Sequence, residues 1–426
     1  NYWDVSQNSE MTFIASTVNT DEVFNFLNLD LKWSPYYLFD DLVVSGLMQI
    51  EDGVDLQIST NKGIIVSGQM NIGSASLHGT DWSGILVNGG GINFDGSYLL
   101  NAVQSLTLEN YASGNILGST FSNSIQGHIL LNSGSTVDVG DSTFELGDDC
   151  IKTSDDSEIM LDISSSNISL CEVGIRATGA QINLHDIQIY TAGTGIRLID
   201  VSGNLKNISI DGDFEIYNGP GNPPIRVISD MKGIEIIDQI NELSISNIII
   251  DMQDIGFSIE DSIGIDINLI DVSKIMFVRT SGHITNLISN EVQIENTRSS
   301  EPLEFVQINT NLVTAVGNSG QSCISLNSGD ADIISLNDTC IDIFKLEIGE
   351  IILNSSFFTE SFIESSNISS FSVDGEAELF LLHTHNFIAT LEETVVEANF
   401  ALTQENSSQD ISFVGSQSKV IIWKKI

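Results

Sequence analysis

The feature that most constrains the fold of this chain is a short apolar triplet that recurs at nearly constant spacing. Four triplets align in one register, with isoleucine-to-isoleucine steps of 22, 24 and 21 residues: Gly127-His128-Ile129, Cys150-Ile151-Lys152, Gly174-Ile175-Arg176 and Gly195-Ile196-Arg197. A second register places an apolar residue at a matching point of successive units, at Phe121, Phe144, Ile168 and Ile208. A unit of this length cannot bury its apolar side alone, so it must stack on its neighbours.

The segments between these triplets predict an all-β chain. Short runs of Ile, Leu and Val alternate with Gly, Asn, Asp and Ser, and almost no segment shows helical periodicity over ten residues. With 41% hydrophobic residues, the chain can bury a sizeable core. Units made of three short strands and polar turns predict a parallel β-helix, in which equivalent residues of adjacent coils lie about 4.8 Å apart.

The two ends of the chain differ from its middle. Nine of the 31 aromatic residues fall in the first 39 positions, which is typical of a bulky plug over an open sheet end. The end of the chain alternates strands with Glu-rich turns and finishes in a further apolar strand. We therefore predict an N-terminal cap at residues 1–42, a β-helix at 43–370, and C-terminal strands or a cap at 371–426.

The charge of the chain excludes several classes of partner. Its net charge is −43 because 58 acidic residues face only 15 lysines and arginines. Nucleic-acid binding requires clustered positive charge, so we expect no nucleic-acid partner. An acidic membrane surface is disfavoured for the same reason. No apolar run is long enough to span a bilayer. The first residue, Asn1, is not methionine, which indicates a processed or truncated start.

The four cysteines form two local pairs. Cys150 and Cys171 are 21 positions apart, and Cys323 and Cys340 are 17 apart. Such spacing suits two disulfides between neighbouring coils, although buried free thiols are the alternative. Disulfides are typical of an extracellular or cell-surface protein.

Asparagine sequons favour the same location. We predict glycosylation at the six Asn-X-Ser/Thr sites: Asn167, Asn207, Asn337, Asn354, Asn367 and Asn406. An alternative is that several asparagines stack inside the solenoid, with their amides hydrogen-bonded along its axis. That alternative concerns Asn167, Asn207, Asn247 and Asn367.

Basic residues gather at the position after the repeated isoleucine. Lys152, Arg176 and Arg197 share this register, and Arg226 continues it after a proline-rich stretch. Stacked like charges require neutralisation. One interpretation is a charge ladder neutralised by nearby acids, for which the candidates are Asp148, Asp149, Asp155, Asp156 and Glu172. The other is a ligand-binding groove for an extended, anionic glycan.

The segment Gly147-Asp148-Asp149-Cys150-Ile151 resembles the Gly-Asp-Asp motif of the polygalacturonase family. With the repeat over residues 43–275, it makes the chain similar to the right-handed parallel β-helix superfamily of pectinases, polysaccharide lyases, phage tailspikes and microbial surface proteins. The resemblance implies a right-handed solenoid. It also implies inverting hydrolysis, in which Asp148 and Asp149 would provide the acid and activate water.

Other elements of the family motif are missing. The preceding coil carries Gln126-Gly127-His128-Ile129 in place of an Asn-Thr-Asp motif, and Val173-Gly174-Ile175 lacks the expected histidine. Gly195-Ile196-Arg197 keeps an arginine without its lysine. Catalysis by Asp148 and Asp149 is therefore the less favoured interpretation.

The favoured function is an exported cell-surface protein with a structural or adhesive role. Its expected partners are itself, other surface proteins and a polysaccharide. It needs no cofactor, and its acidic turns are candidate Ca²⁺ ligands. The alternative is a polysaccharide-degrading enzyme, a glycoside hydrolase or a lyase, that uses the Asp148 and Asp149 region.

Overall fold

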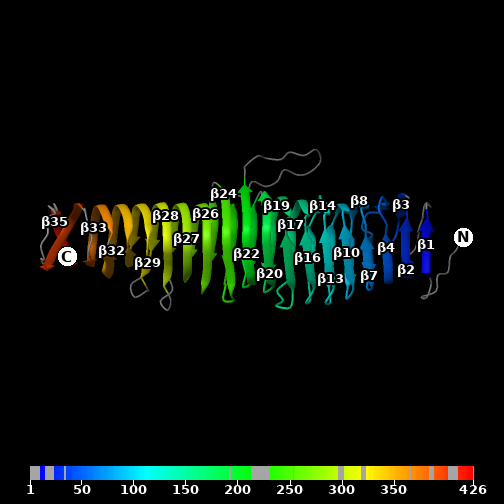
Figure 1. The fold of residues 1–426 in the computed structure, drawn as a ribbon, viewed down its shortest axis with the longest axis horizontal. Helices are drawn as coiled ribbons and strands as arrows, with labels where there is room; N and C mark the ends of the chain where they lie inside the picture. The colour runs from blue at the N-terminus through cyan, green and yellow to red at the C-terminus, as the bar shows by residue number, and fades with distance from the viewer. Residues whose placement is uncertain are drawn as a thin grey trace. The chain divides into compact units, whose positions relative to one another are not determined.

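The computed structural model describes residues 10–14, 24–32, 35–190, 193–212, 231–252, 254–295, 302–317, 323–364, 366–382, 388–401 and 411–425. Two compact units divide the chain, at residues 1–235 and 236–426. Every regular element in the described residues is a β-strand, and the strands form a parallel β-solenoid (Figure 1). A helix of the length and apolarity needed to cross a membrane is absent from these described ranges.

The first strands are β1 (Glu10–Ile14), β2 (Phe24–Lys32), β3 (Pro35–Leu38), β4 (Leu42–Ile50), β5 (Asp55–Ile58), β6 (Gly63–Val66), β7 (Gln69–Ile72), β8 (Ser76–Trp82), β9 (Gly84–Asn88), β10 (Gly91–Asp95), β11 (Tyr98–Ala102) and β12 (Gln104–Glu109). The next are β13 (Ser113–Leu117), β14 (Thr120–Ser122), β15 (Gly127–Leu131), β16 (Thr136–Gly140), β17 (Thr143–Thr153), β18 (Met160–Ser164), β19 (Asn167–Thr178), β20 (Gln181–Tyr190), β21 (Thr194–Ile199), β22 (Ser202–Gly212) and β23 (Lys232–Ile237). The remainder are β24 (Leu243–Met252), β25 (Ile255–Glu260), β26 (Ile265–Val278), β27 (Gly282–Glu295), β28 (Leu303–Val316), β29 (Ile324–Leu326), β30 (Gly329–Asn337), β31 (Ile341–Phe344), β32 (Leu346–Glu364), β33 (Asn367–Leu382), β34 (Ile388–Ala401) and β35 (Ile411–Lys425).

Each coil of the first unit contributes strands to three parallel faces. Face 1 runs through β6, β9, β12, β15, the second halves of β17 and β19, and β21. Face 2 runs through β7, β10, β13, β16, β18 and the first halves of β20 and β22. Face 3 runs through β5, β8, β11, β14, the first halves of β17 and β19, and the second halves of β20 and β22. The strands β1, β2 and β3 also pair in parallel with their neighbours.

The predicted isoleucine register is confirmed on face 1. Ile129 pairs with Ile151, Ile151 with Ile175, and Ile175 with Ile196. All four side chains are buried. They lie in the core because alternate residues of a strand point to opposite sides of its sheet.

The second predicted register is wrong at its last member. On face 3, Phe121, Phe144 and Ile168 pair as expected, but Ile168 pairs with Ile189, and Ile189 pairs with Ile210. Ile208 lies two positions away from this column and is also buried. A slip of two positions keeps the same side of the strand facing the core, so the hydrophobic pattern does not distinguish the two alignments.

The turn from face 3 to face 1 explains the Asn and Asp residues between the apolar runs. Its residues have φ between +50° and +60° on six successive coils, at Asn61, Asp81, Asn101, Asn123, Leu146 and Leu170. Asn and Asp enter this left-handed region more readily than other side chains. The side-chain amide of Asn123 also donates to Oδ1 of Asn101 at 2.6 Å, which joins two coils.

The core of the first unit holds an aromatic cluster and a serine ladder. The rings of Phe121 and Phe144 stack with centroids 5.2 Å apart, and the ring of Phe94 meets Phe121 edge to face at 5.5 Å. At one corner, each serine amide donates to the hydroxyl of the serine on the next coil, through Ser97, Ser119, Ser142 and Ser166. These hydroxyls satisfy backbone donors that the corner would otherwise leave buried and unpaired.

The inward asparagine stack is therefore wrong for the described side chains. Asn167 and Asn247 are exposed, and the half-buried Asn207 donates its side-chain amide to Oδ1 of Asp186 at 2.8 Å. The side chain of Asn367 lies outside those that the structure describes. Serine fills the inward position because its small hydroxyl reaches the neighbouring backbone within the corner.

The second unit is also a stack of parallel coils, and its coils are unequal in length. Ile270 pairs with Leu287, and Leu287 pairs with Ile308, so the first of these two coils is shorter than the second. The rings of Phe277 and Phe305 meet edge to face, with centroids 5.6 Å apart.

Candidate functional site

The basic residues singled out in the sequence lie side by side on face 1. Lys152 pairs with Arg176 and Arg176 with Arg197, on the outward side of β17, β19 and β21. Arg226 lies outside the described residues. The structure therefore brings together three of the four predicted members of this column.

Two of these cations share one buried carboxylate. Arg176 approaches Oδ1 of Asp149 through Nε at 3.0 Å and Nη2 at 2.9 Å, and Nζ of Lys152 lies 3.0 Å from Oδ2. Asp149 is only 6% exposed. Charge-assisted contacts to both oxygens offset the cost of burying the carboxylate.

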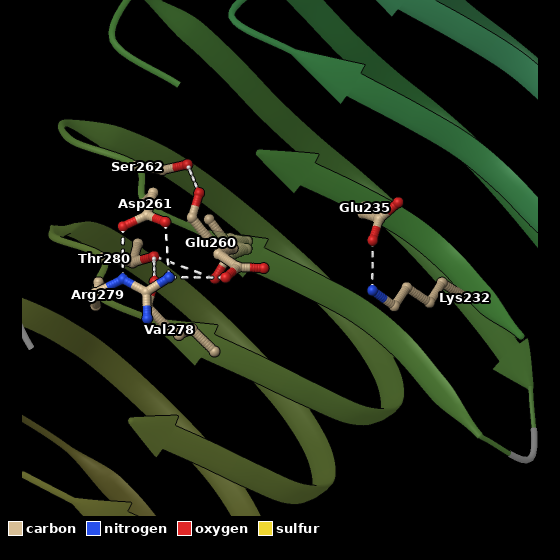
Figure 2. A network of polar contacts seen from close by, with 9 residues as sticks. Lys232, Glu235, Glu260, Asp261, Ser262, Val278, Arg279 and Thr280 are labelled. Carbon is tan, nitrogen blue, oxygen red and sulfur yellow. Dashed lines mark hydrogen bonds and ion pairs between the residues drawn. The ribbon is translucent and has the colours of Figure 1, made fainter. Parts of the chain in front are cut away.

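A second carboxylate forms ion pairs with the next cation and with a lysine. Nε of Arg197 lies 3.1 Å from Oε2 of Glu235, and Lys232 binds Oε1 of the same glutamate. Figure 2 shows the contact between Lys232 and Glu235. Glu235 is 9% exposed. The column is thus held by two bridges in which a buried carboxylate joins two cations.

Asp148 and Glu172 form a carboxyl pair beside these bridges. Gly147 pairs with Cys171 on the neighbouring coil, and this places Asp148 opposite Glu172. The hydrogen bond with Asp148 raises the pKa of Glu172 above its ordinary value, helped by partial burial and by the charges of Asp148 and Asp149 and opposed by Arg176. Glu172 therefore retains its proton to higher pH than an ordinary glutamate.

The contacts of Asp148 and Asp149 can be compared with the geometry that the predicted inverting hydrolysis requires. An inverting pair requires carboxyl groups roughly 6.5–9.5 Å apart so that a water fits between them. Asp148 is hydrogen-bonded to Glu172, and Asp149 is bound by two cations. From the sequence, Glu172 is predicted only to neutralise the column of basic residues. Its pairing with Asp148 could have been found because the two residues are separated by one coil length.

The turns that carry this pair contain leucines in an unusual backbone conformation. Leu146 and Leu170 precede Gly147 and Cys171 and have φ of +57° and +56°. Asn or Asp fills the same turn on the four preceding coils. A leucine gains no local side-chain hydrogen bond there, so the surrounding coils must hold this conformation.

A buried histidine lies beneath the same turn. Nε2 of His128 is 2.9 Å from the carbonyl oxygen of Glu145, so Nε2 donates, and Nδ1 is left to accept from the hydroxyl of Ser105 at 3.4 Å. Burial lowers the pKa of His128 to about 4. The rings of Phe121 and Phe144 flank it. His128 is consequently a neutral core residue with no path to a substrate in this arrangement.

Both predicted disulfides are confirmed. Cys150 bonds to Cys171, and Cys323 bonds to Cys340. The first bridge joins two coils from within the core of the first unit, where both cysteines are buried. The second lies in the second unit with half-buried cysteines. Buried free thiols, the alternative, are thereby excluded for these four residues.

The predicted glycosylation sites lie in different surroundings. Asn167, Asn337 and Asn354 are exposed, whereas Asn207 is half-buried and bonded to Asp186. The side chain of Asn367 and the whole of Asn406 lie outside the part of the chain that the structure describes. Glycosylation stays a prediction at all six sites.

The predicted Ca²⁺ ligands are not gathered into a centre among the described side chains. Groups of three or more His, Cys, Asp or Glu residues placed to hold a metal ion are absent from that part of the structure. The second unit instead has a surface ion network. Arg279 contacts Oδ1 of Asp261 through Nε at 2.6 Å and Oε1 of Glu260 through Nη2 at 2.8 Å (Figure 2).

Comparisons with known proteins add no family to this description. No protein-family model, no curated protein and no solved structure matches the chain. The parallel β-solenoid is therefore established from the chain's own structure.

Proposed function

We propose that this chain is an extracellular, cell-surface β-solenoid with a structural or adhesive role, which assembles with itself or with other surface proteins. The observation that carries the proposal is the pair of cation–carboxylate–cation bridges on face 1. Lys152 and Arg176 are held by Asp149, and Arg197 and Lys232 by Glu235. Such bridges tie coils together and engage the charges that a groove for an anionic glycan would need.

Two further features support an extracellular location. Disulfides persist in oxidising compartments, and this chain has two. Exposed sequons at Asn167, Asn337 and Asn354 are accessible for N-glycans. Exposed acidic turns are proposed to bind Ca²⁺ when copies of the chain associate, because association brings together carboxylates that are separate on one copy.

The alternative is a polysaccharide-degrading enzyme related to the pectin-lyase-like superfamily. Such an enzyme would have to use Asp148 with Glu172, since Asp149 is buried and bound to Arg176 and Lys152. The raised pKa of Glu172 suits a general acid. The direct hydrogen bond between the two carboxyl groups opposes it, because substrate and water need the space between them.

The test measures assembly and turnover on the same purified chain. Sedimentation velocity and electron microscopy over rising protein concentration, with and without Ca²⁺, should reveal concentration-dependent association. Incubation with polyuronates and neutral glycans, followed by assays for reducing ends and unsaturated products, should give no turnover. Depolymerisation that Asp148→Asn or Glu172→Gln abolishes would overturn the proposal in favour of the enzyme.

A further inference from the structure

Tyr111 is an exposed aromatic residue at a turn from face 1 to face 2. Its side chain is 72% exposed, the highest value among the large apolar side chains that the structure describes. Its φ is +63°, in the left-handed region that bulky residues rarely occupy. A solvent-exposed tyrosine in a strained position contributes little to the core. An observed outlier of this kind is a starting point for a functional hypothesis.

The ring of Tyr111 is fixed across two neighbouring coils. One edge of the ring lies close to Gly134, where an added Cβ would come within 2.5 Å of Cε1 and 2.7 Å of Cδ1. Its hydroxyl is hydrogen-bonded to Glu158, which lies on the coil after that of Gly134. This hydrogen bond and the charge of Glu158 raise the pKa of Tyr111. The ring edge that carries Cδ1 and Cε1 therefore lies against Gly134, while the side chain as a whole stays largely exposed.

The carboxylates beside the ring are also held in place. Asp156 accepts hydrogen bonds from the backbone amides of Gly134 at 3.0 Å and Glu158 at 2.9 Å. This turn leaves the Glu158 carboxylate exposed at the rim of the tyrosine. Met160 follows two positions later and is 52% exposed. An exposed tyrosine ring, the carboxylate hydrogen-bonded to its hydroxyl, and an exposed methionine two residues beyond that carboxylate therefore lie within three successive coils.

A polar ladder continues from this cluster along face 2. The outward residues Asn93, Asn115, Asp138, Asp162 and Asn183 pair in register on successive coils. Nδ2 of Asn183 donates to Oδ2 of Asp162 at 3.0 Å. The coils repeat at about 4.8 Å, a distance comparable to the length of one pyranose unit. Amide and carboxylate groups repeated at this distance can bond the hydroxyls of an extended sugar chain.

We propose that Tyr111, Glu158 and Met160 form a binding subsite for a neutral pyranose unit, and that the rest of a neutral glycan lies along the ladder of face 2. The C–H groups on one side of a pyranose carry partial positive charge and stack on the negative face of an aromatic ring. The carboxylate of Glu158 accepts hydrogen bonds from the sugar hydroxyls. The ladder carries carboxylates and the chain a net charge of −43, so acidic sugars are repelled.

This inference rests on the adhesive part of the proposed function and names its ligand class. It is distinct from the basic column on face 1, whose cations would suit an anionic glycan. The ladder lies on face 2, whereas the basic column lies on face 1.

The experiment is calorimetric titration of the full chain with cellohexaose, mannohexaose, chitohexaose and hexagalacturonate. At least one of the three neutral hexasaccharides should bind, and hexagalacturonate should not. Tyr111→Ala should weaken that binding by about tenfold or more, which corresponds to the loss of one stacking contact. Tyr111→Phe keeps the ring and should stay within about threefold of the unmodified chain. The matched control is Tyr98→Ala, which removes a 51% exposed tyrosine from face 3 and should have no effect.

Circular dichroism of Tyr111→Ala checks that the solenoid persists, and Glu158→Gln tests the site without removing the ring. The inference is overturned if none of the neutral hexasaccharides binds, if Tyr111→Ala binds like the unmodified chain, or if hexagalacturonate binds equally well. Self-association without sugar binding would overturn this inference and leave the structural proposal standing. Sugar binding without self-association would leave this inference standing and would overturn the proposal that the chain assembles with itself.

Discussion

Asp149 and Arg176 lie 27 residues apart in the sequence and join two adjacent coils through a two-pronged contact. Nε and Nη2 of the arginine lie 3.0 and 2.9 Å from Oδ1 of the aspartate. The carboxylate is buried and the guanidinium is half-buried. The second carboxylate oxygen is bound by Lys152. Asp149 is therefore the central member of a three-residue bridge.

Removing the charge of Asp149 is expected to destabilise the first unit. Asp149→Asn leaves Arg176 and Lys152 close together without their shared anion, so the free energy of unfolding should fall by about 2 kcal/mol. Urea denaturation at pH 7 measures the change. The matched control is Asp95→Asn on face 2, an exposed site that should stay within about 0.5 kcal/mol of the unmodified chain. Equal effects of the two variants would contradict the bridge.

His128 predicts a fall in stability as the solution becomes acidic. Its pKa is about 4 in the folded chain and 6.5 as the ordinary value, so the folded state favours the neutral ring. The corresponding stabilisation is complete above pH 6.5 and is lost as the pH falls towards 4. The loss amounts to about 3 kcal/mol at roughly 1.4 kcal/mol for each tenfold change in proton affinity.

The test compares the chain with His128→Gln, which keeps a donor for the carbonyl of Glu145 but does not titrate. Urea midpoints at pH 7.5 and 4.5 are measured for both proteins. The carboxyl groups titrate in both proteins, so the difference between their two changes in urea midpoint isolates the contribution of His128. If both proteins lose stability in parallel, His128 does not carry the predicted effect.

Much of the fold could be predicted because a solenoid repeats its constraints. Ile129, Ile151, Ile175 and Ile196 recur at the coil length, and the Asn and Asp residues mark left-handed turns. The errors arose where two alignments satisfy the same pattern. Ile208 and Ile210 both face the core, so the apolar pattern does not decide between them.

The site was less predictable because its partners depend on side-chain direction and on unequal coils. The register of Lys152, Arg176 and Arg197 followed from the repeat. The choice of Asp149 over Asp148 did not, since strict alternation along a strand would put Asp148 on the side of Lys152, and this strand breaks the alternation with three successive buried residues from Asp149 to Ile151. Glu235 follows Arg197 by well over one ordinary coil length, so no repeat aligned it.

The carboxyl pair of Asp148 and Glu172 predicts a coupled titration. Because Asp148 raises the pKa of Glu172, Asp148→Asn should bring that pKa back towards its ordinary value. The stabilisation from protonated Glu172 is complete below its ordinary pKa and is lost as the pH rises through the raised value, opposite in direction to His128. Carboxyl-labelled nuclear magnetic resonance of Glu172 measures the shift. Asp138→Asn on face 2 is the control, and a Glu172 pKa that is the same in both variants would refute the pair.

The two disulfides should differ in their resistance to reduction. Cys150 and Cys171 are buried in the core, whereas Cys323 and Cys340 are half-buried. Reduction requires a thiolate to reach a sulfur atom, so limited dithiothreitol should open Cys323–Cys340 first. Alkylation followed by mass spectrometry identifies the free cysteines at each time point.

The same difference should appear in stability. Replacing Cys150 and Cys171 together by alanine should lower the free energy of unfolding by about 3 kcal/mol from the loss of the loop constraint alone. The empty space left in the core adds to that loss. The matched double alanine variant at Cys323 and Cys340 loses a similar constraint but opens less buried space, so its loss should be smaller. Earlier reduction of Cys150–Cys171, or a greater loss at Cys323 and Cys340, would show that burial does not govern how these bridges hold the coils.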